Sequence, residues 1–270
     1  MGTIADLRRR AQRRTDNLYD TLFTRRVSIY VTAVCYALGL SANAVSMLNV
    51  VVGLTACVLI ALGTGWQIAV GIALVHLFAV LDSVDGELAR LRQRFSLAGL
   101  FLEDLAAYTM INGMFLAVGW YVQRTTGCAW PFVLAIIVVA IGRNAMQVAR
   151  RAVMKSIATR RPLSADALAR HRERTAGAPS STRRLAERVL HYTNVWLVMT
   201  TMIALEELGV TAHLAMYTVY VYGTLVLVKE AAVIATYLFT DGLDRMLLDV
   251  YDRAGTLPTD PVPGVDLAGD

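Results

Sequence analysis

Long apolar runs separated by short polar breaks dominate the pattern of this chain. Six of these runs carry almost no charge, and each is close to the ~20 residues that an α-helix needs to cross the hydrocarbon core of a bilayer. The pattern predicts transmembrane helices at about residues 43–63, 66–90, 98–122, 129–153, 191–208 and 213–239. The expected fold class is therefore an all-α integral membrane protein, built as one bundle of six transmembrane helices.

Polar segments flank and interrupt this bundle. Residues 1–42 combine a long basic lead with a short, interrupted apolar run. This combination favours an N-terminal amphipathic helix in the membrane interface over a cleaved signal peptide. The six-helix transmembrane domain is expected over residues 43–240, with a cytoplasmic loop at about 156–188. Residues 241–270 form a cytoplasmic tail whose proline-rich end is predicted to be disordered.

The composition supports a membrane protein and restricts its partners. The chain is 56% hydrophobic and only 17% charged, whereas about a quarter of the residues in a soluble domain are charged. Its net charge of +5 comes from arginines at the N-terminus and after the second and fourth predicted helices. The positive-inside rule then places both termini in the cytoplasm, in a multi-pass protein of the cell inner (cytoplasmic) membrane. We expect these arginines to contact membrane lipids and not nucleic acid.

Acidic residues gather where the second predicted helix ends and the third begins. Asp82 and Asp85 are three residues apart and so share a helix face, and Glu103 and Asp104 return to the same membrane surface after a short turn. Carboxylates this close would repel one another, and burial near hydrocarbon adds a further cost. A divalent cation removes both problems, and hard oxygen ligands favour Mg²⁺ or Mn²⁺. We predict a metal site formed by Asp82, Asp85 and Glu103.

Small and basic residues follow the two aspartates on the same helix. Gly86 and Ala89 leave room for a bulky group to approach the backbone, and Arg90 carries a fixed positive charge that can reach a phosphate. A lone aspartate at a helix end would most simply be an ordinary polar residue. This combination instead predicts that Asp82, Gly86, Ala89 and Arg90 bind a nucleotide diphosphate, because acids inside a membrane are costly and usually functional.

These residues form a recognisable signature, which reads Asp82-x-x-Asp85-Gly86-x-x-Ala89-Arg90, then eight residues, then Gly99. It resembles the first half of the signature of the CDP-alcohol phosphotransferase (CDP-alcohol phosphatidyltransferase) family. Residues 40–46 resemble the segment that opens the first span of that family, and the six-span layout extends the resemblance over about 26–240.

The resemblance implies a divalent-metal-dependent enzyme of phospholipid or related lipid biosynthesis. Such an enzyme transfers a phosphatidyl or substituted phosphoryl group from a CDP-linked lipid donor to a small or lipid alcohol acceptor and releases CMP. Members of the family commonly form homodimers, although no stripe of small residues identifies an interface in this sequence.

The second half of the signature departs from the family pattern. The family has two further aspartates, the last of which is a metal ligand and the proposed base. Glu103 stands at the first of these positions and can still bind metal, but Ala107 stands at the second and cannot. Asp104 is the predicted substitute, although it points about 100° around the helix from Glu103. Asp104 and Glu103 are therefore the predicted catalytic residues.

Three interpretations remain open at this point. The chain is a divergent transferase in which Asp104 or water takes the proton, an enzyme whose unusual acceptor or donor needs no general base, or a non-catalytic binding or scaffold protein. The costly charges of Asp82, Asp85 and Arg90 favour the first two. Arg143, deep in the fourth predicted helix, is a candidate for binding an acceptor phosphate, because a deep membrane arginine needs a partner.

Overall fold

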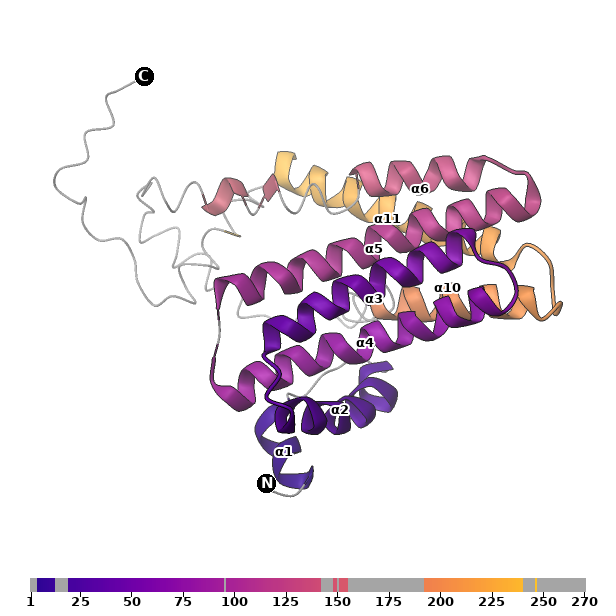
Figure 1. Ribbon diagram of the computed structural model, residues 1–270. Helices are drawn as coiled ribbons and strands as arrows, with labels where there is room; N and C mark the ends of the chain where they lie inside the picture. The colour runs from indigo at the N-terminus through magenta and orange to yellow at the C-terminus, as the bar shows by residue number, and fades with distance from the viewer. Residues whose placement is uncertain are drawn as a thin grey trace, which may run out of the picture. The chain divides into compact units, whose positions relative to one another are not determined.

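The secondary structure is helical throughout the part of the chain that the structure describes. The computed structural model describes residues 4–12, 19–94, 96–141, 148–149, 151–154, 192–239 and 246. Within these residues, turns connect the helices and no strand occurs (Figure 1). The chain divides into two compact units, Met1–Val139 with Thr182–Thr224, and Ala140–Ser181 with Leu225–Asp270. The first unit holds every predicted site residue except Arg143.

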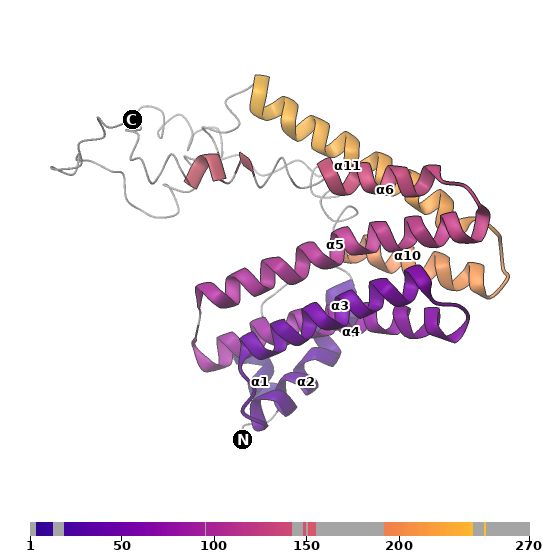
Figure 2. The same ribbon diagram turned by 45° about the horizontal axis from the view of Figure 1, so that its top comes forward.

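Three long helices form the centre of the first unit: α3 (Ala42–Leu62), α4 (Trp66–Arg92) and α5 (Leu97–Thr126). They follow one another up and down, and α3 packs against both α4 and α5 (Figures 1 and 2). Glycines allow the close approach. A β-carbon placed at Gly53 would lie 2.9 Å from Cδ2 of Phe78, and one at Gly113 would lie 2.9 Å from Sγ of Cys57. Small residues at such contacts let helix backbones approach closely.

Local capping brings three helix ends to one end of the bundle. Ser41 caps α3 by accepting a hydrogen bond from the amide of Ala44 at 3.1 Å, and Ser96 caps α5 by accepting one from the amide of Gly99 at 2.9 Å. Helix α4 stops at this end with Gln93 in the left-handed conformation, at a φ of 51°. The start of α3, the end of α4 and the start of α5 therefore meet in space.

The N-terminal helices pack beside the same end of α4 (Figure 1). They are α1 (Ile4–Ala11), a short π-helix η1 (Asp20–Thr24) and α2 (Arg25–Ala37). Leu7, Ala11 and Ile29 form a buried cluster with Leu91 of α4. The location of this segment in the membrane interface stays a prediction, but its attachment to α4 is direct.

The later helices include α6 (Trp130–Ile141), α10 (Tyr192–Glu207) and α11 (Leu214–Phe239). Among the described residues, α3, α4, α5 and α11 are long and apolar enough to cross a membrane, so the chain is a multi-pass membrane protein. The described parts of α6 and α10 are shorter, and the count of six spans stays a prediction. Arg143, the loop at 156–188 and all of the tail at 241–270 except residue 246 lie outside the described residues.

Candidate active site

A cavity of about 540 Å³ opens where α3, α4 and α5 meet. The two halves of the sequence signature both contribute to its wall, although they lie on different helices. The signature residues that line it are Asp85, Gly86, Ala89, Arg90, Gly99 and Glu103. Asp82 lies about one turn before Asp85 in α4 and does not line the cavity.

Asp85 is held in place by α3. Its side chain is 6% exposed and its Oδ2 accepts a hydrogen bond of 2.7 Å from the hydroxyl of Ser46, which is itself buried. A hydrogen bond to a carboxylate is stronger than one between neutral groups. Ser46 belongs to the segment at 40–46 that the sequence marked only by resemblance, and no role for its side chain could be inferred from the pattern. The structure shows that it orients Asp85.

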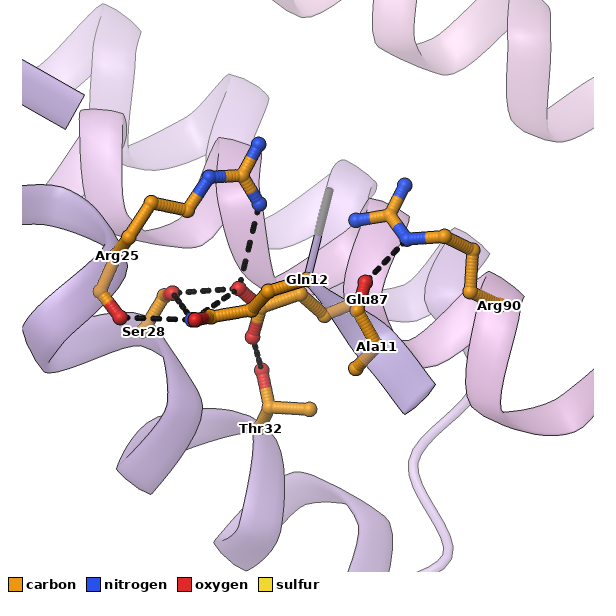
Figure 3. Close-up of polar contacts among 7 residues, drawn as sticks. All are labelled: Ala11, Gln12, Arg25, Ser28, Thr32, Glu87 and Arg90. Carbon is orange, nitrogen blue, oxygen red and sulfur yellow. Dashed lines mark hydrogen bonds and ion pairs between the residues drawn. The ribbon is translucent and has the colours of Figure 1, made fainter. Parts of the chain in front are cut away.

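Arg90 lies over the small residue that precedes it by one turn. A β-carbon placed at Gly86 would be 3.2 Å from Nη1 of Arg90 and 3.4 Å from Nη2. The glycine gives the guanidinium room to lie here, because a side chain at this position would crowd it. The Nε of Arg90 donates a hydrogen bond to the carbonyl oxygen of Ala11, at the end of α1 (Figure 3). One side of the guanidinium is therefore fixed by the N-terminal segment, and the other lies at the cavity wall.

Glu87, which the sequence analysis did not single out, is fully buried between the signature residues. Its carboxylate accepts hydrogen bonds from Ser28 Oγ at 2.7 Å, Thr32 Oγ1 at 2.6 Å and Gln12 Nε2 at 3.0 Å (Figure 3). The guanidinium of Arg25 lies 3.4 Å away. A buried carboxylate is tolerated only when its partners compensate for the loss of water. All four of these partners come from the N-terminal segment.

The sequence did contain a pattern that could have identified Glu87 as a buried acid with polar partners. The argument that acids near hydrocarbon are costly applies to Glu87 as much as to Asp82 and Asp85. Ser28 and Thr32 are four residues apart, and so present two hydroxyl groups on one face of α2. The sequence could not indicate that these hydroxyl groups meet the carboxylate of Glu87.

The start of α5 approaches α3 through Gly99. A β-carbon placed at Gly99 would lie 2.9 Å from Oδ1 of Asn43 and 3.2 Å from Oγ of Ser96. Asn43 and Ser96 are themselves in hydrogen-bond range, with Asn43 Nδ2 at 3.4 Å from Ser96 Oγ. Gly99 therefore permits the contact that closes this side of the cavity.

The predicted catalytic residues of α5 have different positions. Glu103 and Asp104 are both exposed, but Glu103 lines the cavity with Asp85 and Arg90, whereas Asp104 is not part of its wall. Ala107 is half-buried one turn after Glu103. The structure thus brings Glu103 to the site and leaves the use of Asp104 as a base as a prediction.

The donor chemistry of the site fits a hard divalent cation. Asp82, Asp85 and Glu103 supply only oxygen ligands, of the kind that Mg²⁺ and Mn²⁺ prefer. In addition, the amide of Asn49 on α3 is fully buried and has no hydrogen-bond partner among the described residues at either Nδ2 or Oδ1. Within the same described residues, no three His, Cys, Asp or Glu side chains are gathered around one point. Suitable oxygen donors are present, but their carboxylates are not drawn together.

Comparison with known proteins identifies the family of this chain. A family model described as CDP-alcohol phosphatidyltransferase matches residues 40–175, slightly more than half of the chain. The match begins just before α3 and includes α4 and α5, so it covers the three helices that form the cavity. No curated protein matches the chain. The signature in α4, the cavity that it lines and the extent of the match together place this chain in the CDP-alcohol phosphatidyltransferase family.

Proposed function

We propose that the protein transfers a phosphatidyl or other substituted phosphoryl group from a CDP-linked lipid donor to an alcohol acceptor, with release of CMP. Its family acts in phosphatidyl transfer for lipid biosynthesis. The observation that carries the proposal is the cavity in which Asp85, Gly86 and Arg90 of α4 meet Glu103 of α5. A donor with its diphosphate in this cavity would reach the carboxylates, the arginine and the small residues together.

Arg90 is proposed to bind the diphosphate of the donor. Its Nε bond to Ala11 restricts the orientation of the guanidinium before any ligand arrives. Less side-chain freedom is then lost on binding. Ala89 and Gly86 add little bulk to the same wall, and Arg94 adds a second positive charge. These features support recognition of a pyrophosphate linkage attached to a flat nucleoside.

Asp82, Asp85 and Glu103 are proposed to hold Mg²⁺ or Mn²⁺. A bound divalent ion would neutralise charge on the diphosphate and stabilise the charge that develops on the departing CMP. Ser46 would orient Asp85 for this role through its hydrogen bond of 2.7 Å. Ser46 is buried and lies in the cavity wall beside Asp85.

The acceptor hydroxyl must lose a proton during transfer, and Ala107 cannot accept it. We propose Glu103 for this role ahead of Asp104, because Glu103 lies on the cavity wall. A candidate base must come within hydrogen-bond reach of the proton that it removes. An acceptor that is already ionised, such as a phosphate or a carboxylate, is the second candidate substrate class, and it is favoured by the absence of a carboxylate at Ala107.

The site is proposed to face the cytoplasm in the inner membrane, with both termini on the same side. The clustered arginines of the N-terminal segment support this orientation. Arg143 remains a proposed contact for an acceptor phosphate.

The test uses purified full-length protein in detergent or lipid, a labelled CDP-linked lipid, a panel of acceptors, and Mg²⁺ or Mn²⁺. CMP release is expected, and Asp85→Asn should reduce it by more than the about 10–100-fold that loss of a group supporting a metal ligand typically costs. Asp6→Asn, in an exposed ion pair with Arg9, is the matched control and should retain activity. Failure to release CMP with every acceptor and both metals would contradict the proposal.

A further inference from the structure

Asn49 is an anomaly in the interior of the bundle. It lies on α3, its side chain is 0% exposed, and neither polar atom of its amide has a hydrogen-bond partner among the described residues. Buried amide groups in proteins are almost always hydrogen-bonded, since an unpaired one is destabilising. Among the described residues, none supplies the hydrogen bonds that a buried amide of this kind needs.

The neighbours of Asn49 on the same face of α3 show which residue of α4 lies at its level. Ser46, three residues earlier, bonds to Asp85, and Gly53, four residues later, packs against Phe78. Helices α3 and α4 are antiparallel, and Asp82 lies three residues before Asp85 and four after Phe78. Asn49 is therefore level with Asp82, one turn beneath the cavity.

Its position along α5 follows in the same way. Asn43 lies against Gly99, and Gly53 approaches Met110, with 3.5 Å between the β-carbon position and Sδ. Because α3 and α5 run in the same direction, these two contacts place Asn49 level with residues 105–106. It is thus about one residue from the level of Ala107, where the family signature has its last aspartate. Ala106 and Ala107 both have short side chains at this level.

We propose that Asn49 is an additional ligand of the metal-binding site, and takes over the binding role that Ala107 cannot fill. This inference rests on the proposed function. The Oδ1 of Asn49 supplies a neutral oxygen to the divalent ion, and its Nδ2 donates a hydrogen bond to the carboxylate of Asp82. Amide oxygens are ordinary ligands of hard cations. An amide takes up no proton at neutral pH, so Asn49 replaces the expected aspartate as a ligand and not as a base.

The experiment measures Mn²⁺ binding to purified full-length protein in detergent, by the loss of the paramagnetic resonance signal of free Mn²⁺. Asn49→Leu keeps a similar shape and removes both polar atoms. We expect its Mn²⁺ dissociation constant to rise about tenfold or more. We also expect the midpoint temperature of the metal-free protein to hold or rise, because the variant removes an unpaired buried amide. Asn49→Asp should bind Mn²⁺ at least as tightly as the unchanged protein.

Gln123→Leu is the matched control. Oε1 of Gln123 is also buried without a partner among the described residues, but it lies near the opposite end of α5. This variant should leave the Mn²⁺ affinity unchanged.

The possible outcomes distinguish a failure of the role given to Asn49 from a failure of the proposed metal site. If Asp82→Asn loses Mn²⁺ binding while Asn49→Leu retains it, the role of Asn49 is overturned and the metal site stands. If neither variant changes binding, the proposed metal site itself fails. A lower midpoint temperature in metal-free Asn49→Leu, or its failure to fold, would assign Asn49 a structural role and overturn the inference as well.

Discussion

Arg90 donates a hydrogen bond from its Nε to the carbonyl oxygen of Ala11, although the two residues are 79 positions apart in the chain. Glu87, three residues before Arg90, bonds to Gln12 of the same segment at 3.0 Å. The N-terminal residues are therefore attached to the signature helix at two points. A segment whose arginines suggest only a contact with lipid headgroups also holds two residues of the signature helix in place.

Glu87→Ala should destabilise the protein strongly. The substitution leaves Arg25, Ser28 and Thr32 without their shared acceptor in a buried place. Removal of one partner from a buried charged network typically costs about 3–5 kcal/mol. Thermal unfolding in detergent measures the effect, with Asp6→Ala as the exposed control, for which about 0.5 kcal/mol or less is expected. Equal midpoint temperatures for the two variants would refute the role given to Glu87.

Arg90→Lys should weaken binding of the CDP-linked donor. A lysine ammonium cannot both replace the Nε bond to Ala11 and present a planar pair of donors to a phosphate. Loss of a charged hydrogen bond costs about 1.5–3 kcal/mol, which corresponds to about a 10–100-fold rise in KM for the donor. Arg92→Lys is the matched control, since Arg92 lies over the ring of Tyr36, 5.6 Å from its centroid, and does not line the cavity. A similar KM for both variants would argue against a phosphate contact by Arg90.

Ser46→Ala should lower activity without unfolding the protein. The substitution removes the donor that orients Asp85, and loss of such a supporting group typically costs about 10–100-fold in metal affinity or activity. The rate of CMP release at several Mn²⁺ concentrations measures the effect. Thr55→Val, which removes an exposed hydroxyl bonded to the backbone of the same helix, should behave as the unchanged protein. An unchanged metal requirement in Ser46→Ala would show that Asp85 does not depend on this bond.

Glu103→Gln and Asp104→Asn form a matched pair of adjacent carboxylates. Glu103 lines the cavity and Asp104 does not, so Glu103→Gln should abolish most CMP release while Asp104→Asn retains most of it. Initial rates with one acceptor at saturating donor provide the comparison. The reverse order would identify Asp104 as the substitute base and would require α5 to rotate or bulge at this point.

Ala107→Asp restores the carboxylate that the family signature carries. If the acceptor is an alcohol, turnover should rise to the extent that Glu103 is a weaker base than the family aspartate, within the about 10²–10⁴-fold that general-base catalysis typically contributes. Single-turnover rates with an alcohol and with an ionised acceptor measure the difference. An increase with neither acceptor would show either that Glu103 already suffices as the base or that the acceptor carries no proton to remove.

The sequence could predict the features that depend on neighbouring residues. The predicted spans at 43–63 and 66–90 agree with α3 (Ala42–Leu62) and α4 (Trp66–Arg92) within two residues at each end. Apolar length and capping residues are local properties, so the bounds of these helices can be inferred from short windows. The spacing of Asp85, Gly86 and Arg90 likewise needs only the periodicity of one helix.

Contacts between distant segments of the chain could not be predicted from local sequence patterns. The bonds from Ser46 to Asp85, from Thr32 to Glu87 and from Arg90 to Ala11 join residues 39 or more positions apart. No periodicity links those pairs, because their meeting depends on how α1, α2 and α3 pack around α4.

The sequence by itself determined the membrane class, the helices around the site and the first half of its signature. Only the tertiary structure decided that Glu103 faces the cavity while Asp104 does not, and that Glu87 is a buried anchor. It also decided that Asn49, at the level of Asp82, has no hydrogen-bond partner among the described residues. The physical reason is that hydrophobic length and helical spacing are encoded locally. The partner of a buried polar group depends on which helix faces packing brings together.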